Sequence, residues 1–176
     1  MKMRMNRAVL AGILLVLLEN GVVPWLIPSA WSDRLMPHLT FVLMMYVASF
    51  GGRHRAFLFG LGFGLLSDVL FYGSLIGPYA FGMGLIGYAA GLVLERRMLT
   101  LATLMGVTAM GSVALSTIVY LIYRLFRLTT WPYGFAFYWY IAPSLMLEVL
   151  VALALYLPVR KLLLKPAASQ AEETAV

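Results

Sequence analysis

Hydrophobic residues form six long runs along the chain, and most charged residues lie in the short stretches between these runs. Each run is long enough, or nearly so, to cross the ~30 Å hydrocarbon layer of a membrane as a helix. The pattern predicts an all-α integral membrane protein, a six-transmembrane-helix bundle. The helices are expected near residues 8–27, 35–50, 56–72, 77–94, 99–123 and 139–159. They form one expected transmembrane domain, 1–165, followed by a small and polar tail, 166–176, which we expect to be disordered.

The positions of the basic residues predict how the bundle is oriented. Of the 13 lysines and arginines, all except Arg34, Arg124 and Arg127 fall at the chain ends or in the connections on one side. The positive-inside rule then places both termini in the cytoplasm. The opposite side is expected to carry a long connection from Arg124 to Tyr138 that is rich in aromatic residues. Its residues Arg124, Arg127 and Trp131 either contact a partner protein or anchor the chain at the membrane interface.

The stretch from Gly60 to Gly91 holds nine glycines and one carboxylate within an apolar region. Gly60, Gly64 and Asp68 are four residues apart and therefore share one face of a helix. The same spacing recurs at Gly87 and Gly91 in the next helix. Small residues at this spacing let helix backbones approach closely in a membrane. The sequence thus predicts a face for helix packing or partner binding, composed of Gly60, Gly64, Asp68, Gly77, Gly87 and Gly91.

Three acidic residues, Glu19, Asp68 and Glu148, lie inside the apolar runs. They are eleven or twelve residues from the expected cytoplasmic ends of their helices, so they should occupy one layer near the middle of the membrane. No lysine or arginine is placed at that depth. Because a lone charge is costly there, two explanations remain. The acids are either protonated or hydrogen-bonded to helix amides and nearby polar side chains, or they line a water-filled cavity.

Composition excludes several classes of function. With 62% hydrophobic and 11% charged residues, the chain is outside the range of soluble domains. The net charge of +6 comes from short basic clusters between apolar runs. Such clusters reflect the orientation of the helices in the membrane and contact with anionic lipids, and we expect no binding of nucleic acid. The absence of cysteine excludes disulfides and thiolate sites, and the two histidines lack a second ligand nearby, so no metal or other cofactor is expected. No nucleophile is paired with a base, so we expect no enzyme, although an intramembrane transferase with scattered polar residues is a minor alternative.

A recurring order of motifs points to a family. A proline opens the second helix, a short basic turn follows, and then come a helix with a GxxxGLLxD-like motif and a glycine-bearing helix. The residues are Pro37-His38-Leu39, Tyr46 to Gly51, Gly60, Gly64-Leu65-Leu66-Ser67-Asp68, Gly77 and Gly87-Tyr88. Together with the size and six spans, they resemble the rod shape-determining protein MreD family.

The resemblance implies a non-catalytic scaffold subunit in the plasma (inner) membrane of a bacterium. This subunit would belong to the cell-elongation (rod) complex, bind MreC, and help to organise peptidoglycan synthesis and cell shape. It would also have links to MreB and to the SEDS glycosyltransferase with its penicillin-binding partner. The resemblance implies no catalytic residue and assigns no role to Glu19 or Glu148.

Two alternatives stay open. In span number and size the chain is similar to the substrate-binding subunits of energy-coupling-factor transporters, which suggests a solute-binding transmembrane module. Such a module needs a pocket with convergent polar groups. The layer of three acids alone suggests a proton-coupled transporter.

Overall fold

The computed structural model describes residues 5–21, 25, 38–70, 75–95 and 100–163, and these residues contain helices and short connections but no β-strand. This confirms the all-helical prediction for the described part of the chain. The helices are α1 (Met5–Gly21), α3 (Leu39–Gly51), α4 (Arg53–Leu70), α5 (Pro78–Glu95), α6 (Leu101–Leu125), α7 (Tyr133–Ala136), the π-helical turn η1 (Phe137–Ile141) and α8 (Ala142–Leu163).

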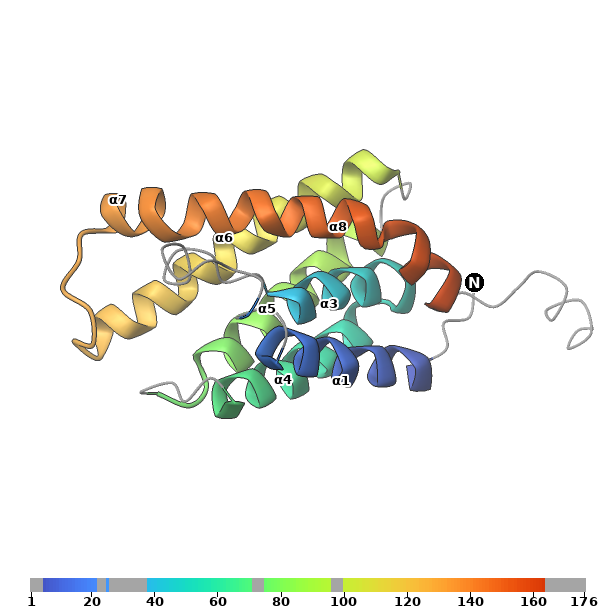
Figure 1. Ribbon diagram of the computed structural model, residues 1–176, viewed down its shortest axis with the longest axis horizontal. Coiled ribbons are helices and arrows are strands. Elements are labelled where there is room, and N and C mark those ends of the chain that lie inside the picture. Colours follow the sequence, from blue (N-terminus) through green and yellow to red (C-terminus); the bar gives the residue numbers. More distant parts are fainter. Residues whose placement is uncertain (1–4, 22–24, 26–37, 71–74, 96–99, 164–176) are drawn as a thin grey trace, which may run out of the picture.

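Helix α3 is the centre of the bundle (Figure 1). It contacts α1, α4, α5, α6 and α8. Nine consecutive residues, Thr40 to Ala48, are buried, which means that every face of the helix is covered. A helix that is apolar all round is stable only in such an environment. One link to a neighbouring helix is polar, because the Tyr46 hydroxyl of α3 donates a hydrogen bond to the backbone carbonyl of Ala152 in α8.

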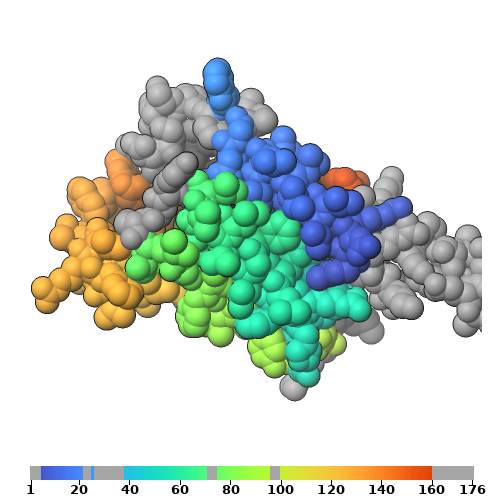
Figure 2. Space-filling model, turned by 90° about the horizontal axis from the view of Figure 1, so that it is seen from below, coloured from blue at the N-terminus to red at the C-terminus, as the bar shows by residue number. Residues whose placement is uncertain are grey.

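Four of the other helices form two antiparallel pairs around α3. Helices α6 and α8 run side by side and extend beyond the rest of the bundle, while α4 and α5 form a tight hairpin (Figure 1). Figure 2 shows α4 on the surface of the molecule between α1 and α5. The outward face of α4 is apolar, with seven exposed hydrophobic residues: Phe57, Leu58, Leu61, Leu65, Leu66, Val69 and Leu70.

Two segments of the described chain are long and apolar enough to cross a membrane, Leu101–Leu125 and Tyr133–Val159. Helices α1 and α3 are also hydrophobic, but they contain only 17 and 13 residues. Helices α4 and α5 have 18 residues each.

Helix bounds differ from the predicted ones most at the last predicted helix, which begins at Tyr133 in place of residue 139. The part of the predicted first helix that follows Gly21, and the start of the predicted second helix, fall largely outside the described residues. Helix α8 continues through Pro158 to Leu163, past the predicted end at residue 159.

The expectation of a long outer connection is wrong. Helix α6 continues to Leu125 and the next helix begins at Tyr133, so only the segment 126–132 connects them. Most of the aromatic residues that we assigned to a loop instead lie in the helix that begins at Tyr133, and Trp131, just before it, stacks on Phe135. The rings of Trp131 and Phe135 are 4.8 Å apart and those of Phe135 and Trp139 are 5.8 Å apart, which is the four-residue spacing of neighbours on a helix surface.

Candidate functional site

The α4–α5 hairpin is packed through four glycines that leave no room for a side chain. A Cβ atom at Gly64 would lie 2.6 Å from the carbonyl oxygen of Tyr79, and one at Gly60 would lie 2.6 Å from that of Met83. From the other helix, Gly87 faces the backbone of Ala56 in the same way, and Gly91 faces that of Arg53. The structure thus brings these four of the predicted glycines together at an interface within the chain.

Gly77 has a different role from the other predicted glycines. A Cβ atom there would meet nothing within 4 Å, so the residue does not pack against another helix. Its φ of 121° is a backbone conformation that residues with a side chain rarely adopt. Gly77 therefore forms the turn that leads into α5, a role that helical spacing could not reveal.

Asp68 holds the start of α5 from the end of α4. One carboxylate oxygen accepts a hydrogen bond of 3.1 Å from the backbone N–H of Tyr79. The other accepts hydrogen bonds of 3.1 Å from Gly77 and 3.0 Å from Ala80. The first N–H groups of a helix have no partner within the helix, and the helix dipole favours a negative charge at this end. Asp68, which is 3% exposed, therefore acts as an N-terminal cap supplied by the neighbouring helix.

The opposite end of the same hairpin has a matching contact that the sequence analysis did not find. Glu95, at the end of α5, accepts a hydrogen bond of 2.9 Å from the backbone N–H of Arg53, at the start of α4. Its other carboxylate oxygen lies 4.0 Å from the Arg53 guanidinium. Each helix of the hairpin thus ends in an acid that binds the start of its partner.

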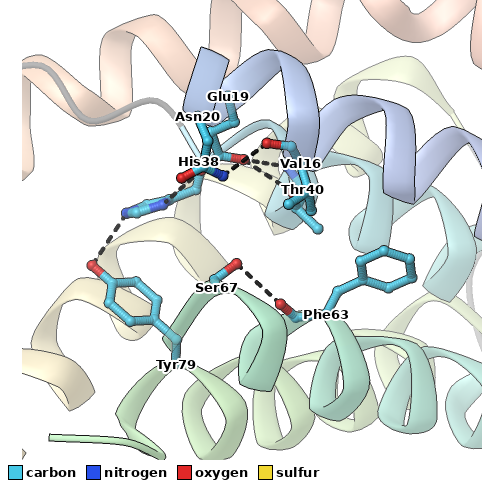
Figure 3. A network of polar contacts seen from close by, with 8 residues as sticks. All are labelled: Val16, Glu19, Asn20, His38, Thr40, Phe63, Ser67 and Tyr79. Atoms are coloured by element: carbon cyan, nitrogen blue, oxygen red, sulfur yellow. Dashed lines mark hydrogen bonds and ion pairs between the residues drawn. The ribbon is translucent and has the colours of Figure 1, made fainter. Parts of the chain in front are cut away.

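Glu19 plays the corresponding part for α3 (Figure 3). From α1, one oxygen of this buried carboxylate accepts hydrogen bonds from the backbone N–H of Thr40 at 3.3 Å and from its hydroxyl at 3.0 Å. The other oxygen lies 3.4 Å from Nδ1 of His38, the residue just before α3. The Tyr79 hydroxyl lies 3.4 Å from Nε2 of the same imidazole, which extends the contacts from α1 through His38 to α5.

Glu148 approaches the same point from α8. It is 2% exposed, and it lies against the Ser112 side chain and the backbone of His38. Its second carboxylate oxygen, Oε2, is buried and has no hydrogen-bond partner among the described residues. Glu19 and Glu148 therefore converge on His38 from two different helices.

The surroundings of two of the three acids have a simple geometric cause. Helices α3 and α5 both begin inside the bundle, and the carboxylates of Glu19 and Asp68 bind the N–H groups exposed at these two starts. Of the two explanations open from the sequence, hydrogen bonding to helix amides accounts for Glu19 and Asp68. His38, Thr40 and Tyr79 complete the arrangement, and only the motif around Pro37-His38-Leu39 drew attention to any of them.

A cavity of about 450 Å³ opens beside His38 and Tyr79. Its walls come from the outer half of α6, from the connection to α7, and from the helix that runs through η1 into α8. The lining residues are His38, Tyr79, Leu115, Ser116, Val119, Tyr120, Tyr123, Thr129, Trp131, Ala136, Tyr140, Ile141 and Ser144. Aromatic rings and hydroxyl groups dominate this lining.

Two of the three predicted outer contact residues are joined through Tyr120. The guanidinium of Arg124 donates a hydrogen bond of 2.7 Å to the Tyr120 hydroxyl, which donates one of 2.8 Å to the backbone carbonyl of Trp131. Arg127 is exposed and has a φ of 56°. Arg124 and Trp131 therefore help to hold the connection in place, while the described contacts leave Arg127 at the surface.

Comparison with known proteins identifies the family. A family model described as rod shape-determining protein MreD matches residues 3–165. A search of curated proteins and a search of solved structures each gave no match. The matched segment contains the α4–α5 hairpin, the three buried acids and all the residues that line the cavity. Since the match extends over nearly the whole sequence, the chain belongs to the MreD family of rod shape-determining proteins.

Proposed function

We propose that this protein is a non-catalytic membrane subunit of the bacterial cell-elongation complex, which binds MreC and helps to organise peptidoglycan synthesis. Membership of the MreD family supports a role in determining rod shape. The observation that supports a structural role is that two of the buried acids bind the starts of neighbouring helices. Asp68 and Glu19 accept hydrogen bonds from the starts of α5 and α3, and so serve to position helices.

The proposed protein crosses the membrane six times, with both termini in the cytoplasm. Figure 1 supports an even number of crossings, because α1 begins and α8 ends at the same end of the bundle. The basic residues of the chain are concentrated toward one side, which supports the assignment of that side to the cytoplasm.

The proposed contact with MreC involves the connection 126–132 between α6 and α7. Each of the four closely packed glycines of α4 and α5 faces the backbone of the other helix, so they are occupied within the chain. Arg127, in contrast, lies on an exposed connection at the end where α6 and α8 extend beyond the rest of the bundle. A charged side chain at the rim of an interface affects association and partner choice more than the fold.

The experiment is co-purification of membrane partners in mild detergent, followed by mass spectrometry. Wild-type protein should recover MreC. Arg127→Asn removes the charge but keeps a residue that tolerates positive φ, and it should reduce this recovery. Arg55→Asn removes an equally exposed charge near the opposite end of the bundle and serves as the matched control. Recovery of MreC by neither wild type nor control would contradict the proposal.

The cavity favours a second candidate function, a solute-binding module similar to the substrate-binding subunits of energy-coupling-factor transporters. Its volume and mixed aromatic and hydroxyl lining are typical of small-molecule sites. Recovery of a pair of cytoplasmic ATPases in the same experiment, in place of MreC, would favour this function.

A further inference from the structure

The cavity beside His38 carries an inference of its own, which does not depend on the rod-complex assignment. We propose that it binds a small amphipathic amine, with an aromatic or aliphatic body among the tyrosines of α6 and η1 and an ammonium group toward His38. The ammonium could belong to a free amine or to the headgroup of an aminophospholipid, and the chemistry is the same in both.

The size and walls of the cavity fit such a ligand. Pockets for small molecules have volumes of about 300–1,000 Å³ and combine apolar walls with a few placed polar groups. This cavity of about 450 Å³ has the rings of Tyr79, Tyr120, Tyr123, Trp131 and Tyr140 on its walls. The faces of such rings attract cations as well as apolar groups. Tyr120 illustrates this property, since the Arg124 guanidinium lies 6.0 Å from the centre of its ring.

Acidic side chains gather at the inner end of the cavity. His38 lines it, and the carboxylates of Glu19 and Glu148 both contact this residue. Asp68 lies close by, bound to the backbone of Tyr79, which also lines the cavity. Among the described residues at this end, two acidic side chains, Glu19 and Glu148, thus contact a single histidine. Within a bundle shielded from water, a carboxylate attracts a cation more strongly than it does in water.

Glu148 gives the most specific indication. Ser144 and Ser116 line the cavity. Ser144 lies one helical turn before Glu148, and Ser116 lies one helical turn after Ser112, which contacts Glu148. The carboxylate is therefore just beneath the lining, with a buried oxygen that lacks a partner in the described part of the chain. A buried acceptor without a donor is unfavourable, so an ammonium group near the inner end would supply the missing attraction.

The opposing charge is Arg124, on the last turn of α6. Its guanidinium is bound to the Tyr120 hydroxyl near the outer end of the cavity. The acidic side chains therefore lie at the inner end of the cavity, and this positive charge lies at the outer end. An amphipathic amine would therefore bind with its ammonium inward and its body outward.

The test is calorimetric titration of the full chain in detergent micelles with 2-phenylethylammonium and with its neutral analogue 2-phenylethanol, each corrected by a protein-free micelle blank. We expect saturable binding of the amine, with an affinity roughly tenfold higher than that of the alcohol. Glu148→Gln should reduce this preference while leaving the affinity for the alcohol unchanged. Ser116→Phe fills the cavity and should abolish binding, and Val119→Phe provides a second blocking variant if the first does not fold. Leu121→Phe adds the same ring to an exposed position of α6 outside the cavity and should bind like wild type.

Repeating the titration in nanodiscs with and without phosphatidylethanolamine separates the two sources. If this lipid competes with the amine, the site is assigned to a lipid headgroup. If the lipid does not compete, the site is assigned to a free amine. Equal affinity for amine and alcohol, or unchanged binding after both blocking substitutions, would overturn the proposal.

Discussion

The carboxylate of Asp68 accepts a hydrogen bond of 3.1 Å from the backbone N–H of Tyr79, and so the end of α4 holds the start of α5. The hairpin is closed in the same manner at its other end, where Glu95 binds the backbone of Arg53. Between these two contacts the helices meet at glycines. Polar contacts at the ends and backbone packing along the middle therefore define the α4–α5 unit.

Asp68 should tolerate asparagine better than leucine. Asparagine retains one acceptor but brings an NH2 group toward backbone N–H donors, so it should cost about 1 kcal/mol of unfolding free energy. Leucine leaves all three N–H groups without their partner and should cost at least about 3 kcal/mol. Unfolding in detergent and rod-shape complementation at matched membrane levels measure the effect. Equal stability of the leucine variant and wild type would show that the cap is unimportant.

Gly64 and Gly62 should respond in opposite ways to alanine. A Cβ atom at Gly64 would collide with the backbone of α5, so Gly64→Ala should destabilise the fold by about 2 kcal/mol or more. At Gly62 nothing lies within 4 Å, so Gly62→Ala should stabilise the helix by up to about 1 kcal/mol. Thermal unfolding of the two variants provides the comparison. Similar melting temperatures for both would contradict the close packing of α4 against α5.

The contact between Glu19 and Thr40 should be energetically coupled. Thr40→Val removes one hydrogen bond and should cost about 1 kcal/mol, whereas Glu19→Leu also leaves the Thr40 N–H unpaired and should cost about 3 kcal/mol. Because the two residues share the contact, the double variant should lose less than the sum of the two single losses.

Thr108→Val is the matched control for this pair. Thr108 is as buried as Thr40, but its hydroxyl donates only to the backbone of its own helix, at Leu104. We expect a loss of about 0.5 kcal/mol or less, because a bond of this kind adds little to helix stability. Full additivity of the Glu19 and Thr40 substitutions would indicate that they act independently.

Reporter fusions should show an even number of crossings. A reporter fused after Lys165 should be active in its cytoplasmic form, and one inserted at Thr130 should be active only in its exported form. Thr130 is suitable because it is exposed and is not among the residues that line the cavity. Activity of both fusions on the same side would contradict the six-crossing arrangement.

Periodicity in the sequence determined which residues share a helix face. The four-residue spacing of Gly60, Gly64 and Asp68 places them on one side of α4 wherever that helix lies, because the geometry of the helix is local. The apolar runs likewise predicted most of the described helices to within a few residues. The aromatic segment before Trp139 was the exception, since its helical start depends on ring stacking that hydropathy does not measure.

Only the tertiary structure decided which residues these faces meet. Glu19 binds Thr40 across 21 residues of sequence and His38 meets Tyr79 across 41, so neither contact leaves a trace in local spacing. Both follow from the position of α3 at the centre of the bundle, where its start needs hydrogen-bond partners from other helices. For the same reason the sequence could predict that three acids share one level but could not assign their partners. It could not show the cavity beside them either, because that space exists only between α6 and α8 once they have packed against the starts of α3 and α5.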